Sequence, residues 1–378
     1  MYKNLKISLS LKLFQFVFTI FKLFPLKKKT TLVTEYGINT TYVANEIKAQ
    51  TDEEIVILKT ETCLQDFDRN AFNVILFNQK KLFSNFKSIY HLATSRYVIV
   101  DSDFIFLAAT PFKPETKCIQ LWHATGSVKS FGLFKRKSPI YKKVFDRMDY
   151  IITGSELMTS FYKDAFNDSD NDRFINTGVP RTDFFFNDLA RKQIKNQLEI
   201  DFPMIKEKTV ILYAPTYREY ELDQIKFEKH LDKLYKELKQ DYVIFLSLHP
   251  KDDMIYKNRF PGFIYNVTSH PNINEIAIGS DLLVTDYSPI LFEYSLLHKP
   301  IVFYAFDLEE FQKARELTIE YESFVPGPVV QSNTELIERI KENNFDLDIV
   351  KSFAEEWNEY SVGNSSANLI DFLYKTKK

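Results

Sequence analysis

Short apolar runs alternate with helical patterns along most of the chain. Runs rich in β-branched and aromatic residues, bounded by turn residues, predict strands. They cover residues 30–37, 54–60, 73–78, 96–102, 118–124, 149–153 and 174–180, and then 209–216, 242–250, 262–267, 281–288 and 300–306. Apolar residues at helical spacing lie between them, at 42–48, 79–93, 227–240 and 289–297. This alternation predicts an α/β protein whose parallel sheets carry helices on both faces.

The predicted elements fall into two halves of similar size, which suggests two doubly wound, Rossmann-like domains. A length of 378 residues suits two domains of about 150–200 residues each. We place them at 30–195 and 196–378, with the charged helical stretch 190–208 as the connector. The pattern of 334–375 is helical, and these last helices could cross back to the first half.

Composition excludes several classes of protein. Two cysteines, Cys63 and Cys118, rule out a disulfide scaffold and a Cys-based zinc cluster. The net charge is −2, from 49 basic and 51 acidic residues. A general nucleic-acid binder carries a basic surplus, so we expect no nucleic-acid partner.

The near-neutral average hides a basic, apolar head. Residues 1–29 hold seven lysines and no acid, which leaves 42 basic against 51 acidic residues in the rest. An apolar stripe recurs at helical spacing in Leu13, Phe14, Val17, Phe18, Phe21 and Phe24. The pattern predicts an amphipathic helix at the surface of an anionic membrane. A helix packed on the body is the main alternative.

Two further alternatives for the head are weaker. Its longest uncharged run, 13–21, is about half of what a spanning helix needs. No small-residue cleavage site of the kind that ends a signal peptide follows it.

In open parallel sheets, ligands bind beyond the carboxyl ends of the strands, so polar residues directly after the apolar runs are candidates. His123 follows 118–122 among small residues, and Lys129 lies six positions on. Histidine suits a general base because it titrates near neutral pH, and lysine offers a compact charge for phosphate. A structural histidine and a solvated lysine are the alternatives.

Two more strand ends carry candidate side chains. Thr216 and Arg218 follow 209–214, where an arginine can bind phosphate oxygens bidentately or pair with a neighbouring acid. His249 ends the run at 242–248 and could stabilise charge on a phosphate or leaving group, or bond its own turn.

A fourth strand turns directly into a helix at 281–294. Asp286, Tyr287 and Ser288 form the loop, with Ser288 expected at the N-cap and Pro289 as the first helical residue. Such a helix start suits a phosphate. Glu293, about one turn into the helix, could reach ribose hydroxyls or serve only as a helix acid.

Several motifs are missing from the sequence. The six histidines show no HxxxH or HExxH spacing, and no GxGxxG, P-loop or GxSxG pattern occurs. We therefore expect no obligatory metal ion and no cofactor.

Together these motifs resemble the CDP-glycerol glycerophosphotransferases, which build wall teichoic acids and related capsules. The resembling segments are WHATGSVK, NTGVPRTD, YAPTYR, LSLHPK, VTDYSPILFEYSLLHKPIVFYAFD and VPGPVV, in the family's order between residues 92 and 330. The short N-terminal half and the IQLWHATGSVKSFG segment look most like the branch of teichoic acid primases.

The resemblance implies a GT-B fold with the active site in a cleft between two Rossmann-like domains. It implies transfer of glycerol phosphate from CDP-glycerol to a hydroxyl of an undecaprenyl-diphosphate-linked disaccharide, with release of CMP, at the cytoplasmic face of the membrane. His123 then matches the proposed base, His249 a second essential histidine and Arg218 a phosphate contact. Asp286, Tyr287 and Ser288 match the nucleotide loop, in which Pro289 replaces a second serine. Ala124 likewise replaces a more usual glycine.

Four alternatives to the primase activity stay open. One is a nucleotide-sugar glycosyltransferase of the same fold, which would transfer a sugar rather than a phosphate. The chain could be a short poly(glycerol-phosphate) polymerase, or it could use CDP-ribitol as the donor. It could also be an inactive scaffold docked on the membrane.

Overall fold

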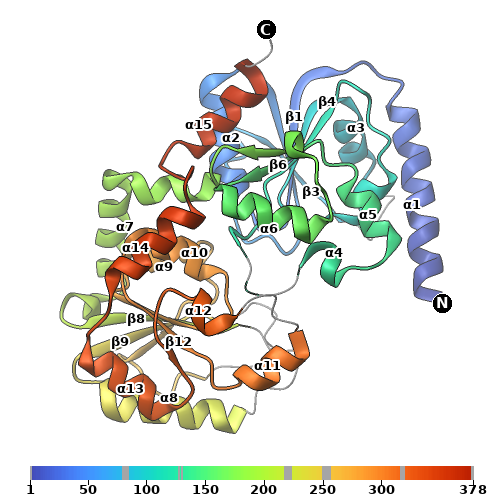
Figure 1. Ribbon diagram of the computed structural model, residues 1–378. Helices are drawn as coiled ribbons and strands as arrows, with labels where there is room; N and C mark the ends of the chain where they lie inside the picture. Colours follow the sequence, from blue (N-terminus) through green and yellow to red (C-terminus); the bar gives the residue numbers. More distant parts are fainter. Residues whose placement is uncertain are drawn as a thin grey trace. The chain divides into compact units, whose positions relative to one another are not determined.

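The structure is a computed structural model that describes residues 2–78, 85–126, 128, 131–216, 224–248, 257–315 and 320–375. It divides into two compact units. The first unit contains Met1–Thr125, Phe131–Asp183 and Glu359–Lys378, and the second contains Gly126–Ser130 and Phe184–Asn358. As the alternating pattern predicts, each unit is an α/β layer structure around one parallel sheet (Figure 1).

The first unit contains a seven-stranded sheet in the order β3-β2-β1-β4-β5-β6-β7. Its strands are β1 Lys27–Thr34, β2 Glu54–Lys59, β3 Asn73–Leu76, β4 Ser95–Val100, β5 Lys117–Gln120, β6 Tyr150–Thr153 and β7 Phe174–Asn176. All neighbours pair in parallel. The strand order reverses between β1 and β4, and in such sheets ligands bind at the carboxyl ends beside that reversal.

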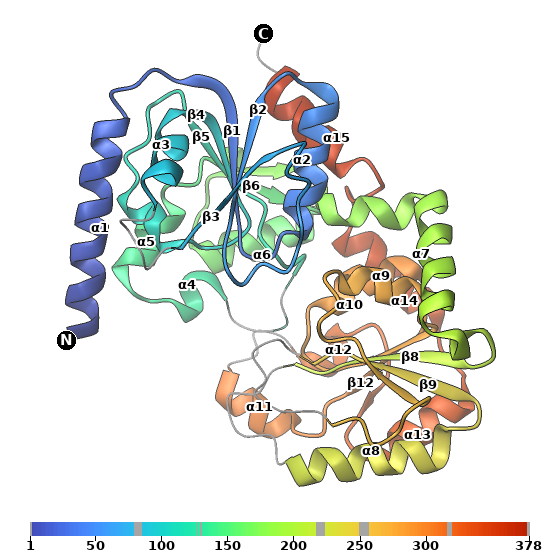
Figure 2. The ribbon, with the colours of Figure 1, turned by 180° about the vertical axis from the view of Figure 1, so that it is seen from behind.

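Helices cover both faces of this sheet. They are α1 Tyr2–Phe21, α2 Ile38–Gln50, α3 Phe86–Thr94, η2 Ile105–Ala109, α4 Gly132–Lys135, α5 Pro139–Phe145, α6 Glu156–Phe166, η3 Asn171–Arg173, α15 Ser365–Ile370 and η7 Asp371–Lys375. Alternate strand residues such as Leu32 and Ile99 pack with α2 and α15 in one core, as the side-chain period of two in a strand requires. Figure 2 shows α2 and α15 side by side over this face.

The second unit contains a six-stranded parallel sheet in the order β10-β9-β8-β11-β12-β13. Its strands are β8 Thr209–Ala214, β9 Tyr242–Leu246, β10 Ile264–Asn266, β11 Leu282–Thr285, β12 Ile301–Tyr304 and β13 Val329–Val330. Its helical elements are α7 Asp188–Asp201, η5 Pro203–Lys206, α8 Gln224–Leu238, α9 Ile273–Ile278, α10 Ile290–Tyr294, η6 Ser295–Leu297, α11 Leu308–Arg315, α12 Tyr321–Phe324, α13 Asn333–Glu342 and α14 Leu347–Trp357, while η4 Pro180–Phe186 runs from the first unit into the second.

The expected boundary at 195/196 is wrong, because α7 packs on the second unit. Leu198 of α7 is buried and packs closely on Gly279 at the end of α9. A Cβ added to Gly279 would lie only 2.5 Å from Leu198 Cδ1. The division therefore falls at 183/184.

The C-terminal segment returns to the first unit, and specific hydrogen bonds hold it there. The Asp183 carboxylate accepts from the backbone N–H groups of Ser365 (2.7 Å) and Ser366 (2.8 Å). Ser361 Oγ accepts from the Val179 N–H at 3.0 Å, and the Tyr360 N–H donates to the Gly154 carbonyl.

Helix α1 packs on the first unit with the stripe that the sequence assigned to the membrane. Phe14 and Phe18 are buried against Phe106 and Phe112. Leu13 and Phe24 at the edge of the stripe stay exposed, at 37% and 48%, as do Phe16 at 64% and Ile20 at 45%, which lie outside it. The choice of face was therefore wrong, because apolar area on the body covers the stripe.

The boundary of the head at residue 29 is also wrong, because Lys27–Thr34 is the first strand. The side chain of Lys29 is fully buried, and its Nζ donates to Thr94 Oγ1 at 2.7 Å and lies 3.2 Å from His91 Nδ1. Burial lowers the pKa of Lys29 to about 8. One of the seven lysines thus lies inside the unit and does not face solvent.

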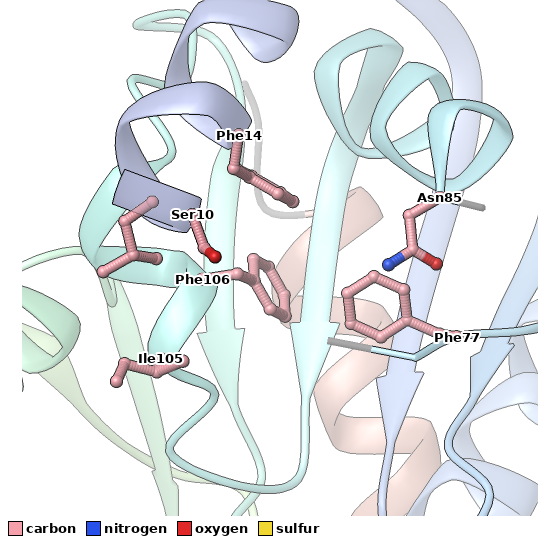
Figure 3. A pocket seen from close by; sticks show the side chains of 7 residues that line it. Ser10, Phe14, Phe77, Asn85, Ile105 and Phe106 are labelled. Atoms are coloured by element: carbon pink, nitrogen blue, oxygen red, sulfur yellow. The ribbon is translucent and has the colours of Figure 1, made fainter. Parts of the chain in front are cut away.

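A small cavity lies under α1, lined by Ser10, Leu11, Phe14, Phe77, Asn85, Ile105 and Phe106. Figure 3 shows Phe14 and Phe106 projecting into it from α1 and η2. Its volume of about 20 Å³ holds one water molecule and no lipid chain. Among the described residues, no helix is both long enough and apolar enough to cross a membrane.

Candidate functional site

The carboxyl ends of β1 and β4 are tied together by one buried carboxylate. Asp101 directly follows β4 and is 1% exposed. It accepts from three successive backbone N–H groups after β1, those of Glu35 (2.9 Å), Tyr36 (3.2 Å) and Gly37 (3.1 Å), and from the Thr34 hydroxyl. Burial raises the pKa of the Asp101 carboxyl, and these four donors oppose that rise.

His123 lies at the end of the next strand, β5, and its ring is held on three sides. The Tyr36 ring stacks on it with centroids 4.2 Å apart and planes at 15°, and the Trp122 ring lies 4.8 Å away at 24°. Its Nδ1 is 3.1 Å from the carbonyl oxygen of Asp101. A carbonyl can only accept, so in the neutral ring Nδ1 carries the proton and Nε2 carries the lone pair.

The backbone around His123 is also fixed. Trp122 has a positive φ of 57°, which is strained for a large residue. Its carbonyl accepts from Asn39 Nδ2 at 2.9 Å, and its N–H donates to Gln120 Oε1 at 2.8 Å. Arg181, 7% exposed, donates from Nη1 to the His123 carbonyl at 2.6 Å. These contacts hold the left-handed turn that aims His123.

Acidic and basic groups surround this strand end. Asp103 pairs with Arg136, Nε to Oδ2 at 3.0 Å, and burial raises the pKa of Asp103 to about 6 although Arg136 opposes the rise. Burial and then the nearby carboxylates, Glu35 first, raise the pKa of Tyr36, so its hydroxyl stays protonated at neutral pH.

In the second unit, the ends of β8 and β11 are joined in a similar way. Asp286 follows β11, is 2% exposed, and its Oδ1 accepts from the Thr216 N–H at 2.8 Å. Thr285 Oγ1 donates to the Ala214 carbonyl at 2.7 Å. The structure therefore brings the predicted residues Thr216 and Asp286 together at the ends of these two strands.

Tyr287 is fully buried and supports the loop from within. Its ring stacks on Phe311 with centroids 3.7 Å apart, and its hydroxyl donates to Asp307 Oδ1 at 3.2 Å. The Tyr321 hydroxyl donates to the Asp286 carbonyl at 3.0 Å. Core packing therefore occupies the Tyr287 ring, and its predicted contact with substrate stays a prediction.

The helix after this loop begins one residue later than predicted. Pro289 is its N-cap rather than its first helical residue, and Ser288 Oγ accepts from the Ile290 N–H only at 3.5 Å. Helix α10 has five residues, so it lacks the length of aligned peptides that a macrodipole needs. Glu293 lies in α10 with its side chain 4% exposed.

Three predicted site residues lie outside the described part of the chain: Lys129, Arg218 and His249. The described residues contain no cluster of three or more His, Cys, Asp or Glu side chains that could hold a metal ion.

Sequence reasoning missed four residues around His123: Tyr36, Asn39, Asp101 and Arg181. Asp101 and Tyr36 stand directly after strands, at 96–100 and 30–34, so the strand-end criterion already contained the signal for both. Arg181 lies in the NTGVPRTD segment, but its bonds to the His123 carbonyl and to Thr125 Oγ1 (3.3 Å) appear only in the folded chain.

The arrangement in the first unit can accept a proton at one defined atom. A neutral imidazole with Nδ1 bonded to a carbonyl presents Nε2 as the base, which is the form that general-base catalysis at a hydroxyl requires. The described residues of the second unit join Thr216 and Asp286 at the carboxyl ends of β8 and β11, where a nucleotide binds in doubly wound folds.

Comparisons with known proteins place the chain in a family context. The model of the family described as CDP-Glycerol:Poly(glycerophosphate) glycerophosphotransferase matches residues 18–375. The teichoic acid glycerol-phosphate primase of Bacillus subtilis is 32% identical over 358 residues, which cover 92% of each chain. The teichoic acid poly(ribitol-phosphate) polymerase of Bacillus spizizenii is 30% identical over 383 residues, 96% of this chain and 59% of that one.

A solved structure has the same fold. The wall teichoic acid polymerase TagF aligns with a TM-score of 0.79 at 20% identity, over 99% of this chain and 96% of that one. The GT-B-like fold of two Rossmann-like units expected from the motifs is thereby confirmed.

Proposed function

Because the chain belongs to the CDP-glycerol:poly(glycerophosphate) glycerophosphotransferase family, we propose that it primes a wall teichoic acid. It transfers glycerol phosphate from CDP-glycerol to a hydroxyl of an undecaprenyl-diphosphate-linked disaccharide and releases CMP. The match to a primase over 92% of both chains carries this proposal. The orientation of His123 supports the chemistry.

In the proposed reaction, the acceptor hydroxyl attacks the phosphorus that bears the glycerol. A new P–O bond forms, the P–O bond to CMP breaks, and Nε2 of His123 takes the hydroxyl proton. Positioning and charge stabilisation supply most of the rate in phosphoryl transfer. His249, Arg218 and Lys129 would stabilise the diphosphate charge, and the loop that contains Thr216, Asp286 and Ser288 would hold the nucleotide, with Glu293 toward its ribose.

The test is to incubate the full chain with CDP-glycerol and a lipid-linked disaccharide. CMP release with one added glycerol phosphate per acceptor supports priming, and His123→Ala should lower turnover by about 10²–10⁴-fold. Wild-type turnover in a folded His123→Ala variant would refute the assignment of the base.

A ribitol or polymerase activity is the second candidate, because the poly(ribitol-phosphate) polymerase matches 96% of this chain. The same assay run with CDP-ribitol separates these activities. Long products with either donor would replace priming by polymerisation, and preference for CDP-ribitol would change the donor. Absence of turnover with both donors would favour the inactive scaffold.

We also propose that the protein lies peripherally on the cytoplasmic face of the membrane, with α1 against an anionic lipid surface. The outward side of α1 exposes apolar residues, namely Leu9, Leu13, Phe16 and Ile20, and Leu23 and Phe24 follow in the turn. Lys12, Lys27 and Lys28 are exposed nearby. Helix α5 packs on η2, which in turn contacts α1, and it adds the exposed Lys142 and Lys143. Apolar side chains flanked by lysines favour the interface of an anionic membrane.

A further inference from the structure

We propose that Tyr36 and Asp101 are positioning residues for His123, which they hold as a clamped imidazole ready to accept a proton. The inference rests on the proposed role of His123 as the base and adds two residues that the motifs did not contain. It follows from three connected observations in the first unit: a stack of rings, a shared carboxylate and a fixed tautomer.

The first observation is that the His123 ring lies between two aromatic faces. Tyr36 is nearly parallel to it at 4.2 Å and Trp122 at 4.8 Å. Trp122 is 6% exposed and packs further on Phe131, Phe145 and Phe166, so that side of the ring is rigid. Tyr36 is 45% exposed, so it forms the more exposed side of the clamp.

The second observation is that Asp101 fixes the backbone at Tyr36. The carboxylate binds the N–H groups of Glu35, Tyr36 and Gly37, which fixes the backbone that carries the Tyr36 ring. The backbone carbonyl of the same Asp101 accepts from His123 Nδ1. One residue therefore sets the position of the base with its main chain and the position of the stacking ring with its side chain.

The third observation concerns the charge that develops when His123 accepts a proton. An imidazolium between two π faces is stabilised by the ring quadrupoles, and its Nδ1–H keeps a carbonyl acceptor. Among the described residues, the other charged groups near the clamp include Glu35 beside Tyr36, Asp103 with Arg136, and Arg181 on the His123 carbonyl. Replacing Tyr36 by an uncharged residue leaves all of them in place, so the stack can be tested separately from the charges.

The experiment compares Tyr36→Leu with Tyr36→Phe in the full chain. Tyr36→Leu removes the ring, and we expect kcat to fall by about 10-fold or more while the KM for the CDP-alditol donor changes less than about twofold. The acid limb of the pH–rate profile should move to lower pH by roughly 0.5–1 unit, because the imidazolium loses one π face. Tyr36→Phe keeps the ring and should match the wild type in all three measurements.

Nuclear magnetic resonance of the histidine side chains gives a readout that does not depend on turnover. The His123 signals, identified by their loss in His123→Ala, should carry upfield ring-current shifts. Tyr36→Leu should reduce these shifts to the part that the Trp122 ring contributes, and Asp101→Asn should also reduce them. Phe86→Leu is a matched control on α3, since Phe86 is 44% exposed, and it should alter neither the shifts nor kcat.

The outcomes separate the two proposals. If His123→Ala is inactive but Tyr36→Leu keeps the wild-type kcat, pH profile and histidine shifts, the clamp is refuted and the proposed function stands. If the wild type turns over no CDP-alditol, the proposed function fails, and the ring-current shifts still decide whether the clamp exists. If Asp101→Asn does not fold, the Tyr36 pair decides alone.

Discussion

At some positions in this protein, the local backbone and packing restrict which residue type can be accommodated. Gly178, after β7, has φ +86°, and a Cβ there would lie 2.4 Å from both Ser365 Oγ and the Tyr360 carbonyl oxygen. The C-terminal segment docks directly over this position. Trp122 shows the opposite case, a large residue kept at φ 57° because its ring, carbonyl and N–H are all held.

We expect Gly178→Ala to destabilise the first unit by about 2–4 kcal/mol, because it combines a left-handed backbone with a steric overlap. Gly262 is the matched control. It has φ +80° with no atom within 4 Å of its Cβ position, so Gly262→Ala should cost only about 1–2 kcal/mol. Urea unfolding measures both variants. Equal losses would show that contact with the C-terminal segment contributes nothing.

Among the elements, α1 has a buried inner face and an outer face with exposed apolar side chains. Its inner face, with Phe14 and Phe18, is part of the core of the first unit, and the Phe21 ring contacts Tyr90 of α3 edge-on. Lys113 Nζ donates to the Phe24 carbonyl at 2.6 Å and fixes the end of the helical segment. The outer face keeps its apolar side chains in solvent, which is costly for a monomer unless another surface covers them.

We expect the triple substitution Leu13→Ser, Phe16→Ser and Ile20→Ser to weaken binding to anionic vesicles by at least about 10-fold, because each buried apolar side chain contributes about 1.5–3 kcal/mol. Sedimentation with phosphatidylglycerol vesicles measures this. The control variant carries Leu189→Ser and Ile200→Ser on α7, where both residues are 68% exposed, and it should bind as the wild type does. Undiminished binding of the triple variant would contradict the proposal for α1.

At the scale of the whole molecule, each unit buries one neutral histidine. In the first unit, burial and then Lys29 lower the pKa of His91 to about 4. In the second, burial lowers the pKa of His230 to about 4, although its Nδ1 bonds Asn333. His230 also stacks on Tyr304 at 4.9 Å and 17°. In both units, the buried histidine therefore makes the folded state less stable as the pH falls.

Stability should fall on acidification. Between pH 6.5 and pH 4, the unfolded chain binds a proton at each of these histidines and the folded chain does not, so stability rises with pH in this window. We expect a loss of about 2 kcal/mol per histidine at pH 5 relative to pH 7.5, measured by urea unfolding. His230→Leu should remove this slope for the second unit only. A variant that keeps the full slope would exclude His230 as its source.

The sequence by itself determined the elements and their order, because strand and helix periodicity and turn residues act over short distances. Twelve of the strands, the parallel class and the placement of His123 at a strand end follow from that local pattern. So does the family, because its motifs are contiguous segments whose residues stand next to one another along the chain.

The tertiary structure decided what depends on contacts between distant segments. It joined α7 to the second unit and residues 359–378 to the first. It turned the apolar stripe of α1 inward, since an apolar face packs on whatever apolar surface the fold presents, and periodicity carries no information about that surface. It also placed Tyr36 and Asp101, 87 and 22 positions before His123, around the same imidazole. A sequence pattern points to His123 as the proposed base, and only the fold shows which residues hold its ring.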